Sequence, residues 1–230
     1  MQKFGIICAS DEELAPFLAS LENADVMEKA QLRFYQGQLM GVQVVVLYSG
    51  VCKVNAAIAA QLLVDFFQVD AILNVGVAGG IAEHVALFDT VISTKALYHD
   101  MDEDVLTEFH PWLPAPYFKA DARLLEAART ACQGDGTVHF GPMATGERFI
   151  QDDMRQAIAQ RYAPLSVDME TAAIAHVCHV NRVPFLAIRT ITDTASHEAH
   201  GDFEANCAKA SAIAKDVALR LLAVLSSSSR

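Results

Sequence analysis

Short apolar runs alternate with longer amphipathic runs along most of the chain. The short runs are rich in β-branched and other apolar residues and are mostly bounded by turn residues, which predicts buried strands at Phe4–Cys8, Val42–Leu47, Ala71–Val75, Thr90–Ser93 and Phe185–Thr190. The longer runs predict helices at Val54–Phe67, Leu124–Cys132, Met154–Tyr162, Met169–Val180 and Ala205–Leu225. This alternation predicts an α/β fold, a three-layer α/β/α sandwich with helices on both faces of a central mixed, largely parallel sheet.

Nothing in the pattern marks a domain boundary. The sequence contains no internal repeat and no linker rich in Pro, Gly or Ser, so residues 1–230 are expected to form a single domain with a frayed tail at 226–230. One long segment, His99–Phe118, lacks periodicity and contains several prolines. Segments of this length in compact domains are usually functional or lie at an interface.

The composition excludes several classes of partner. A formal net charge of -11 disfavours binding to nucleic acid or to an anionic membrane surface, because both depend on clustered Lys and Arg. Every apolar run is too short to span a bilayer, and the N-terminus shows no export signal. We therefore expect a cytoplasmic protein that acts on a neutral or cationic small molecule and has no nucleic acid or membrane partner.

The cysteines and histidines do not predict a metal site. The 5 cysteines are scattered and never spaced as Cys-x-x-Cys, which argues against a disulfide framework and a zinc site and suits a reducing compartment. His176 and His179 stand at i, i+3 on a predicted helix, but no further ligands can be assigned to them, so helix packing is the favoured interpretation. We expect no metal and no cofactor.

Three polar or glycine-rich segments follow the predicted ends of buried strands. They are Ser10-Asp11-Glu12-Glu13, Gly76–Gly80 and Thr192-Asp193. Open α/β sheets bind ligands at the carboxyl ends of their strands, so these segments are expected to converge on one cleft. Structural explanations remain open for two of them. Ser10 and Glu13 have the spacing of a helix capping box, and the glycine cluster matches neither the dinucleotide-binding nor the P-loop pattern.

Two further charged segments are candidates for chemistry. Asp168-Met169-Glu170 begins a helix whose next turns are almost wholly apolar, and a buried Glu is rare unless it is paired or functional. Arg189 precedes Asp193 by four residues at the end of an apolar strand, which suits an acid held beside a ligand. A helix-start acid at Glu170 and a structural ion pair between Arg189 and Asp193 are the alternative interpretations.

Together, several segments resemble the 5'-methylthioadenosine/S-adenosylhomocysteine nucleosidases of the nucleoside phosphorylase superfamily. They are Ser49–Ala57, Asn74–Gly80, Tyr98–Asp100, Val167–Glu170 and Arg189–Asp193, and the resemblance extends over nearly the whole chain. It implies hydrolysis of the N-glycosidic bond of methylthioadenosine and S-adenosylhomocysteine to adenine and the 5'-thio-substituted ribose, as used in methionine salvage. It also makes 5'-deoxyadenosine a candidate substrate.

The resemblance assigns roles to individual residues. Breaking an N-glycosidic bond builds positive charge on the ribose and negative charge on the departing base, so the site needs a proton donor at the base and an anion near the sugar. By resemblance, Asp193 protonates adenine N7, Glu13 activates the attacking water, and Glu170 binds the ribose hydroxyls. The further residues expected to contact substrate are Ser10, Val51, Val77, Ala78, Gly79, Phe149, Ile150, Met169, Arg189, Thr192, Phe203, Leu113 and Pro114.

Within this set, Leu113 and Pro114 are expected to act in a second subunit. The resemblance implies a homodimer in which the loop around Phe109–Pro116 of the partner closes the pocket for the 5'-substituent. The resemblance also implies that Phe149 stacks on adenine, that the backbone of Ile150 binds the edge of the base, and that Met169 packs against the ribose. The resemblance therefore implies that the irregular segment His99–Phe118 closes the substrate pocket of the partner subunit.

The sequence departs from the family pattern at four positions. Ser10 stands where Met is common, and Cys52 replaces a Gly. Val75 and Val77 replace a Thr and a Ser, which removes a hydroxyl that commonly helps to hold the water. Two alternative functions therefore stay open: a purine nucleoside phosphorylase of the same fold, and a nucleoside-binding protein without catalysis. Intact carboxylates at all three catalytic positions favour the nucleosidase.

Overall fold

The fold is described from a computed structural model that covers residues 2–150, 152–194 and 199–227, without the side chains of 152–153 and 199–204. Its strands are β1 (Lys3–Cys8), β2 (Glu22–Lys29), β3 (Leu32–Leu39), β4 (Val42–Tyr48), β5 (Ala71–Gly80), β6 (Thr90–Tyr98), β7 (Phe118–Lys119), β8 (Val138–Thr145), β9 (Ser166–Asp168) and β10 (Phe185–Asp193). Its helices are α1 (Asp11–Leu18), α2 (Lys53–Asp65), α3 (Glu103–Glu108), α4 (Ala122–Ala131), α5 (Asp152–Tyr162), α6 (Thr171–Asn181) and α7 (Ala199–Ser227).

All of these strands belong to one mixed sheet. Strands β4, β1, β5 and β10 pair in parallel in that order, and β6, β8 and β9 form a second parallel group. Antiparallel pairings of β5 with β9 and of β10 with β6 join the two groups, so that β5, β9, β8, β6 and β10 close into a ring. The ring brings the ends of β5, β9 and β10 together.

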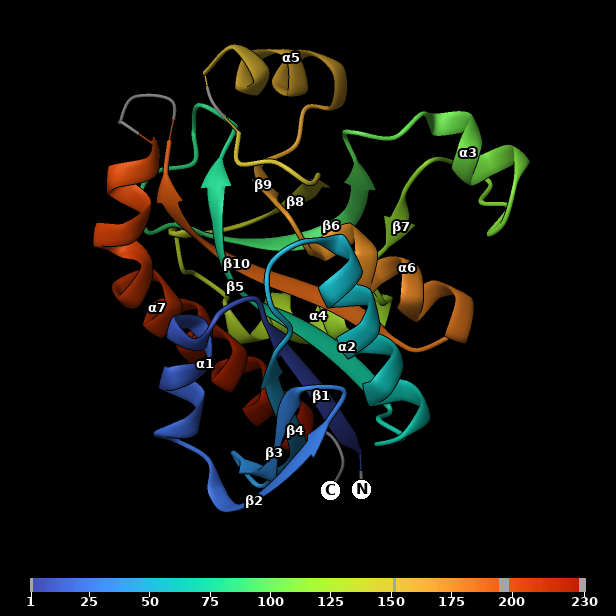
Figure 1. The fold of residues 1–230 in the computed structure, drawn as a ribbon. Coiled ribbons are helices and arrows are strands. Elements are labelled where there is room, and N and C mark those ends of the chain that lie inside the picture. Colours follow the sequence, from blue (N-terminus) through green and yellow to red (C-terminus); the bar gives the residue numbers. More distant parts are fainter. Residues whose placement is uncertain (1, 151, 195–198, 228–230) are drawn as a thin grey trace.

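Helices cover both faces of the sheet, which confirms the predicted three-layer α/β fold. Side chains alternate between the faces, so that Ile7 packs into one apolar cluster while its neighbours Ile6 and Cys8 pack into another. The first cluster contains the buried apolar residues of α2 and α6, and the second contains those of α1 and α4 and of the C-terminal half of α7. Figure 1 shows α1 and α7 on one side of the sheet and α2 and α6 on the other.

The predicted strands and helices are confirmed, but several elements were not predicted. The β-hairpin of β2 and β3 turns at Ala30 and Gln31, which adopt positive φ values of 51° and 61°. Strand β2 has no buried residue, β3 buries only Phe34 and Leu39, and the turn lacks the Asn-Gly signal usual for such a conformation, so the hairpin leaves no clear pattern in the sequence. The segment His99–Phe118 is also not wholly irregular, because it contains the short helix α3.

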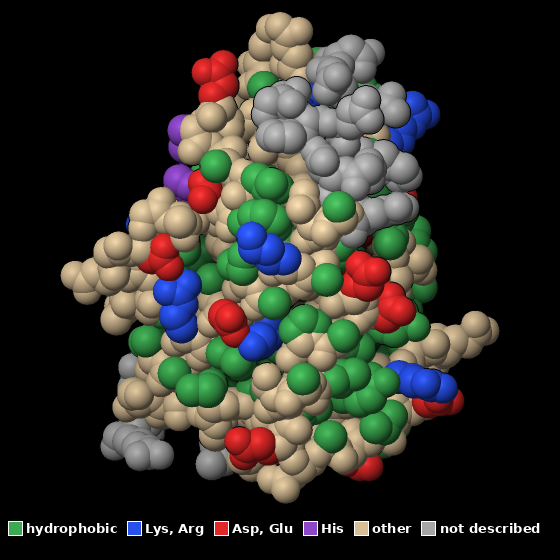
Figure 2. Space-filling view, turned by 90° about the vertical axis from the view of Figure 1, so that its left-hand side faces the viewer, with side chains coloured by type: hydrophobic (Ala, Val, Ile, Leu, Met, Phe, Trp, Pro, Cys, Tyr) green, Lys and Arg blue, Asp and Glu red, His purple; other side chains and the backbone are tan. Residues whose placement is uncertain are grey.

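On the face that carries α1 and α7, acidic and basic side chains are interspersed among apolar ones (Figure 2). Among the described residues, no helix is both long and apolar enough to cross a membrane.

Candidate active site

A cavity of about 230 Å³ opens where β1, β5, β9 and β10 end. Most of the residues predicted to bind substrate line it, namely Ser10, Glu13, Val51, Val77, Ala78, Gly79, Phe149, Ile150, Met169, Glu170 and Asp193. The predicted convergence of strand ends is therefore observed. Residues that the sequence analysis did not assign to catalysis or substrate binding also line the cavity: Ala9, Arg148, Arg155, Val167 and Asp168.

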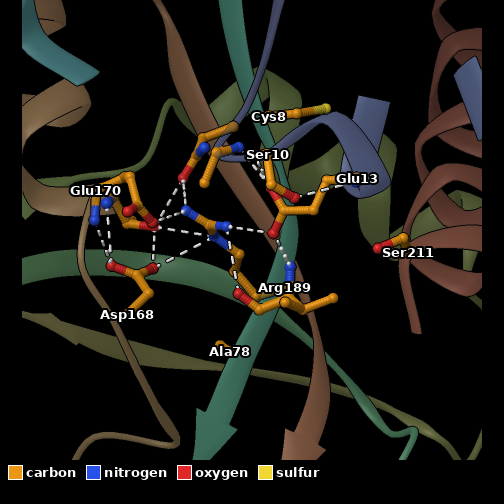
Figure 3. Close-up of polar contacts among 12 residues, drawn as sticks. Cys8, Ser10, Glu13, Ala78, Asp168, Glu170, Arg189 and Ser211 are labelled. Atoms are coloured by element: carbon orange, nitrogen blue, oxygen red, sulfur yellow. Dashed lines mark hydrogen bonds and ion pairs between the residues drawn. The ribbon is translucent and has the colours of Figure 1, made fainter. Parts of the chain in front are cut away.

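Arg189 forms the centre of a buried ion cluster beneath this cavity. Its guanidinium group lies 3.4 Å from Glu13, 3.3 Å from Asp168 and 3.1 Å from Glu170, measured between nitrogen and carboxylate oxygen (Figure 3). Arg189 is 0% exposed and also donates to Asn74 Oδ1 at 2.8 Å. One cation faces three carboxylates, so this end of the site has an excess of negative charge when all three are ionised.

Glu13 serves both the start of α1 and the cavity. Its backbone N–H donates to Ser10 Oγ at 3.3 Å, and its carboxylate accepts from the N–H groups of Ser10 and Ala9, which confirms the capping box. The other carboxylate oxygen accepts from the N–H of Val77 at 2.7 Å. This approach requires Gly76, because a Cβ there would lie 2.2 Å from Glu13 Oε1.

Glu170 is held at the start of α6, 3% exposed. Its carboxylate accepts from the N–H of Cys52 at 2.9 Å and from Arg189. Burial raises the pKa of Glu170 to about 7, with Arg189 opposing the rise and Asp168 and Glu13 adding to it. Glu170 occupies the N-cap position of α6, but its side chain makes no capping hydrogen bond to the helix end.

Asp168 organises the turn between β9 and α6. Its carboxylate accepts from the backbone N–H groups of Glu170 at 3.1 Å and Thr171 at 3.0 Å, and from Thr145 Oγ1 at 2.7 Å. These bonds satisfy the first N–H groups of α6 and fix the position of Glu170. Asp168 thus connects the start of α6 to Arg189, with which it also forms an ion pair.

Asp193 lies at the other end of the cavity and has a different partner from the one considered in the sequence. Arg155 on α5 donates to Asp193 Oδ2 at 2.7 Å, and Thr192 Oγ1 donates to Oδ1 at 2.9 Å. The structural ion pair between Arg189 and Asp193 is not formed, because each side chain pairs elsewhere. No sequence motif marks Arg155, which is one basic residue on a largely polar helix.

The wall between these two ends is mostly apolar. Ile150, Val77 and Ala78 are buried, while Phe149 and Val51 stay 37% and 47% exposed. An apolar wall of this kind suits an aromatic ring. Two of the departures from the family pattern lie near this cavity. At Val77, the backbone N–H donates to Glu13 although the side-chain hydroxyl is lost. Cys52 adopts φ 82°, a conformation that favours Gly.

Some predicted residues do not line the cavity. Arg189 and Thr192 are fully buried beneath it, where Arg189 binds the carboxylates and Thr192 binds Asp193. Leu113 is buried in a core cluster of its own chain and Pro114 is exposed. The side chain of Phe203 lies outside the described residues.

The paired histidines pack against an aromatic ring, as expected. The rings of His176 and His179 lie 4.9 and 5.8 Å from the ring of Phe118, measured between centroids. In the part of the chain that the structure describes, no three His, Cys, Asp or Glu residues are grouped to hold a metal ion.

Comparison with known proteins decides the family. The sequence profile of the phosphorylase superfamily matches residues 3–223. The chain belongs to this superfamily. A 5'-methylthioadenosine/S-adenosylhomocysteine nucleosidase of Anoxybacillus flavithermus is 39% identical over 86% of the chain and 88% of its own length, and one of Shewanella piezotolerans is 38% identical over 90% and 93%.

A solved superfamily structure agrees with the sequence comparison. The 5'-methylthioadenosine/S-adenosylhomocysteine nucleosidase of S. pneumoniae, solved with the transition-state inhibitor MT-ImmA, superimposes with a TM-score of 0.89. It is 33% identical to the chain, and the match covers 97% of this chain and 100% of that one. The resemblance inferred from the sequence motifs is therefore confirmed at the level of family and fold.

Proposed function

We propose that the chain hydrolyses the N-glycosidic bond of 5'-methylthioadenosine and S-adenosylhomocysteine and releases adenine. The observation that carries the proposal is the arrangement of the cavity, with a buried cluster of carboxylates at one end and Asp193 at the other. That arrangement matches the charges that develop when ribose and base separate. Two sequence relatives, and a solved structure with the same fold, are named as 5'-methylthioadenosine/S-adenosylhomocysteine nucleosidases.

The proposed reaction separates charge along the cavity. The C1'–N9 bond breaks with its electron pair passing to adenine, and Asp193 gives a proton to N7. The ribose acquires oxocarbenium character beside Glu170, whose carboxylate also accepts from the ribose hydroxyls. Water attacks C1', and Glu13 takes the proton that the water loses. Glu13 is fixed for this role by Val77 and Ala9.

The apolar wall positions the base. Adenine stacks on the exposed ring of Phe149, and the backbone of Ile150 reads its edge, while Met169 packs against the ribose. Arg189 does not touch the substrate in this scheme. It keeps the buried carboxylates in place, which makes it a positioning residue.

The proposal includes a homodimer. The loop around Phe109–Pro116 does not line the cavity of its own chain, and it leaves Phe109 and Trp112 62% and 66% exposed. Large exposed apolar side chains of this kind suit an interface between copies of the chain. In the dimer, this loop of one subunit would close the 5' side of the partner's cavity next to Val51. We place the enzyme in the cytoplasm.

Adenine release from methylthioadenosine and S-adenosylhomocysteine, with and without phosphate, tests the proposal. Release that does not depend on phosphate and falls by orders of magnitude in Asp193→Asn is the expected result. Release that requires phosphate would identify a nucleoside phosphorylase. Tight binding of methylthioadenosine without any release would identify a nucleoside-binding protein.

A further inference from the structure

The segment between β8 and α5 carries the wall on which the base is proposed to stack. Arg148, Phe149 and Ile150 line the cavity, and they follow Glu147 directly in the chain. The backbone N–H of Glu147 donates to Asp100 Oδ2 at 2.9 Å. Asp100 stands two residues beyond the end of β6. The position of the wall therefore depends on how Asp100 is held.

Lys53, the first residue of α2, binds both Asp100 and Glu147. Its Nζ donates to the two carboxylate oxygens of Asp100 at 2.9 Å and 2.9 Å, and lies 3.9 Å from Glu147 Oε1. The side chains of Lys53 and Asp100 are 19% and 28% exposed, so water screens this pair less than it screens a surface ion pair. Although burial acts in the opposite direction, the hydrogen bonds from Lys53 and from the Glu147 N–H hold the pKa of Asp100 below its usual value.

The backbone at the start of α2 also joins the two ends of the cavity. The first N–H groups of a helix have no partner within the helix. Here the N–H of Cys52 donates to Glu170 Oε1 at 2.9 Å, and the next N–H, that of Lys53, donates to Glu147 Oε1 at 3.1 Å. The start of α2 thus connects Glu170, at the proposed ribose end, to the segment that carries the wall for the base.

We infer that Lys53 is a positioning residue for the base, which holds Phe149 and Ile150 in place against adenine without contacting the substrate. This inference rests on the proposed function, which stacks adenine on Phe149. Lys53 is not among the described residues that line the cavity. Its effect is electrostatic: without the ammonium group, the carboxylates of Asp100 and Glu147 would lie close together without a cation between them, and their repulsion would displace the segment.

The ribose end is expected to keep its geometry when the Lys53 side chain is replaced. Glu170 is bound by the backbone N–H of Cys52 and by Arg189, and neither bond uses the Lys53 side chain. Loss of Lys53 should therefore weaken binding of the base more than it slows cleavage. The split between KM and kcat distinguishes this role from a structural one, because a smaller folded fraction lowers the apparent kcat and leaves KM unchanged.

The experiment measures kcat and KM for methylthioadenosine, and the Kd of adenine by calorimetry. In Lys53→Met, KM and the Kd of adenine are expected to rise roughly 10-fold, while kcat stays within about threefold of wild type. Lys53→Arg keeps the charge and is expected to stay within about threefold of wild type in all three constants. Lys215→Met is the matched control, because Lys215 is 16% exposed and pairs with Asp216 at 2.6 Å on α7, and it is expected to change none of them.

A double-mutant cycle with Phe149→Leu tests whether Lys53 acts through Phe149. If it does, the two substitutions are not additive, and Lys53→Met raises the Kd of adenine by no more than about threefold in the Phe149→Leu background. An equal rise in both backgrounds would overturn the inference.

The kinetic constants separate this inference from the proposed function. If Lys53→Met lowers kcat at an unchanged KM, or matches wild type in all three constants, the inference is overturned and the proposed function stands. If wild type releases no adenine from methylthioadenosine, the proposed function is overturned, and this inference with it.

Discussion

Replacing Glu170 by Gln tests whether burial or the ion pair with Arg189 governs this carboxyl group. Burial raises the pKa of Glu170 from 4.5 to about 7 although Arg189 opposes the rise. One pKa unit corresponds to about 1.4 kcal/mol, so ionising Glu170 in the folded protein costs on the order of 3 kcal/mol more than in the unfolded chain. The folded protein binds the extra proton between these two pKa values, so stability falls as the pH rises from 4.5 to about 7.

The side chain of Gln cannot ionise, so Glu170→Gln is expected not to lose stability as the pH rises. We expect its free energy of unfolding, relative to that of wild type, to increase by about 2–3 kcal/mol between roughly pH 5 and pH 8. Urea unfolding at a fixed protein concentration measures the difference, because the stability of the proposed dimer would depend on concentration. Glu126→Gln, on the exposed face of α4, is the control and is expected to show no such change. If the free energy of unfolding of Glu170→Gln relative to wild type stays constant or decreases with pH, the reasoning is refuted. Arg189 would then affect the pKa of Glu170 more than burial does.

Three further substitutions test the catalytic geometry and the departure at Cys52. Asp193→Asn keeps the side-chain shape without a proton to give, and is expected to lower kcat for adenine release by at least about 100-fold. Gly76→Ala puts a carbon 2.2 Å from Glu13 Oε1 and is expected to lower kcat/KM at least about tenfold, whereas Gly136→Ala, with nothing within 4 Å, leaves it unchanged. Cys52→Gly relieves a backbone conformation of φ 82°, ψ 163° and is expected to raise the free energy of unfolding in urea by about 1 kcal/mol; a decrease would contradict this.

The central strands could be predicted because burial on both sides leaves a continuous apolar run. Strands β1, β5 and β10 are of this type, and the polar residues after them were therefore placed correctly at one end of the sheet. The hairpin of β2 and β3 gave no such signal, since its first strand is exposed throughout. Strand β8 was missed because Gly141 and Pro142 interrupt its apolar pattern.

The pairing of charges within the site could not be predicted from spacing. Arg189 and Asp193 stand four residues apart on one strand, which suggests a local pair, yet Arg189 binds carboxylates from α1 and from the β9–α6 turn. The partner of Asp193 is Arg155, which comes from a different element, helix α5. Both pairings depend on how the closed ring of strands brings distant segments together, and that closure leaves no local pattern in the sequence.

The distribution of charge in the cavity argues for hydrolysis rather than phosphorolysis. At the end where the ribose would lie, one Arg189 is set against Glu13, Asp168 and Glu170, so at least one negative charge remains uncompensated even when Glu170 is protonated. A phosphate anion approaching C1' there would be repelled, while neutral water would not. Among the described residues, the basic side chains that line the cavity are Arg148 and Arg155, and Arg155 is already paired with Asp193 at the base end. The same negative charge stabilises an oxocarbenium-like ribose, so the feature that excludes the anion also supports cleavage by water.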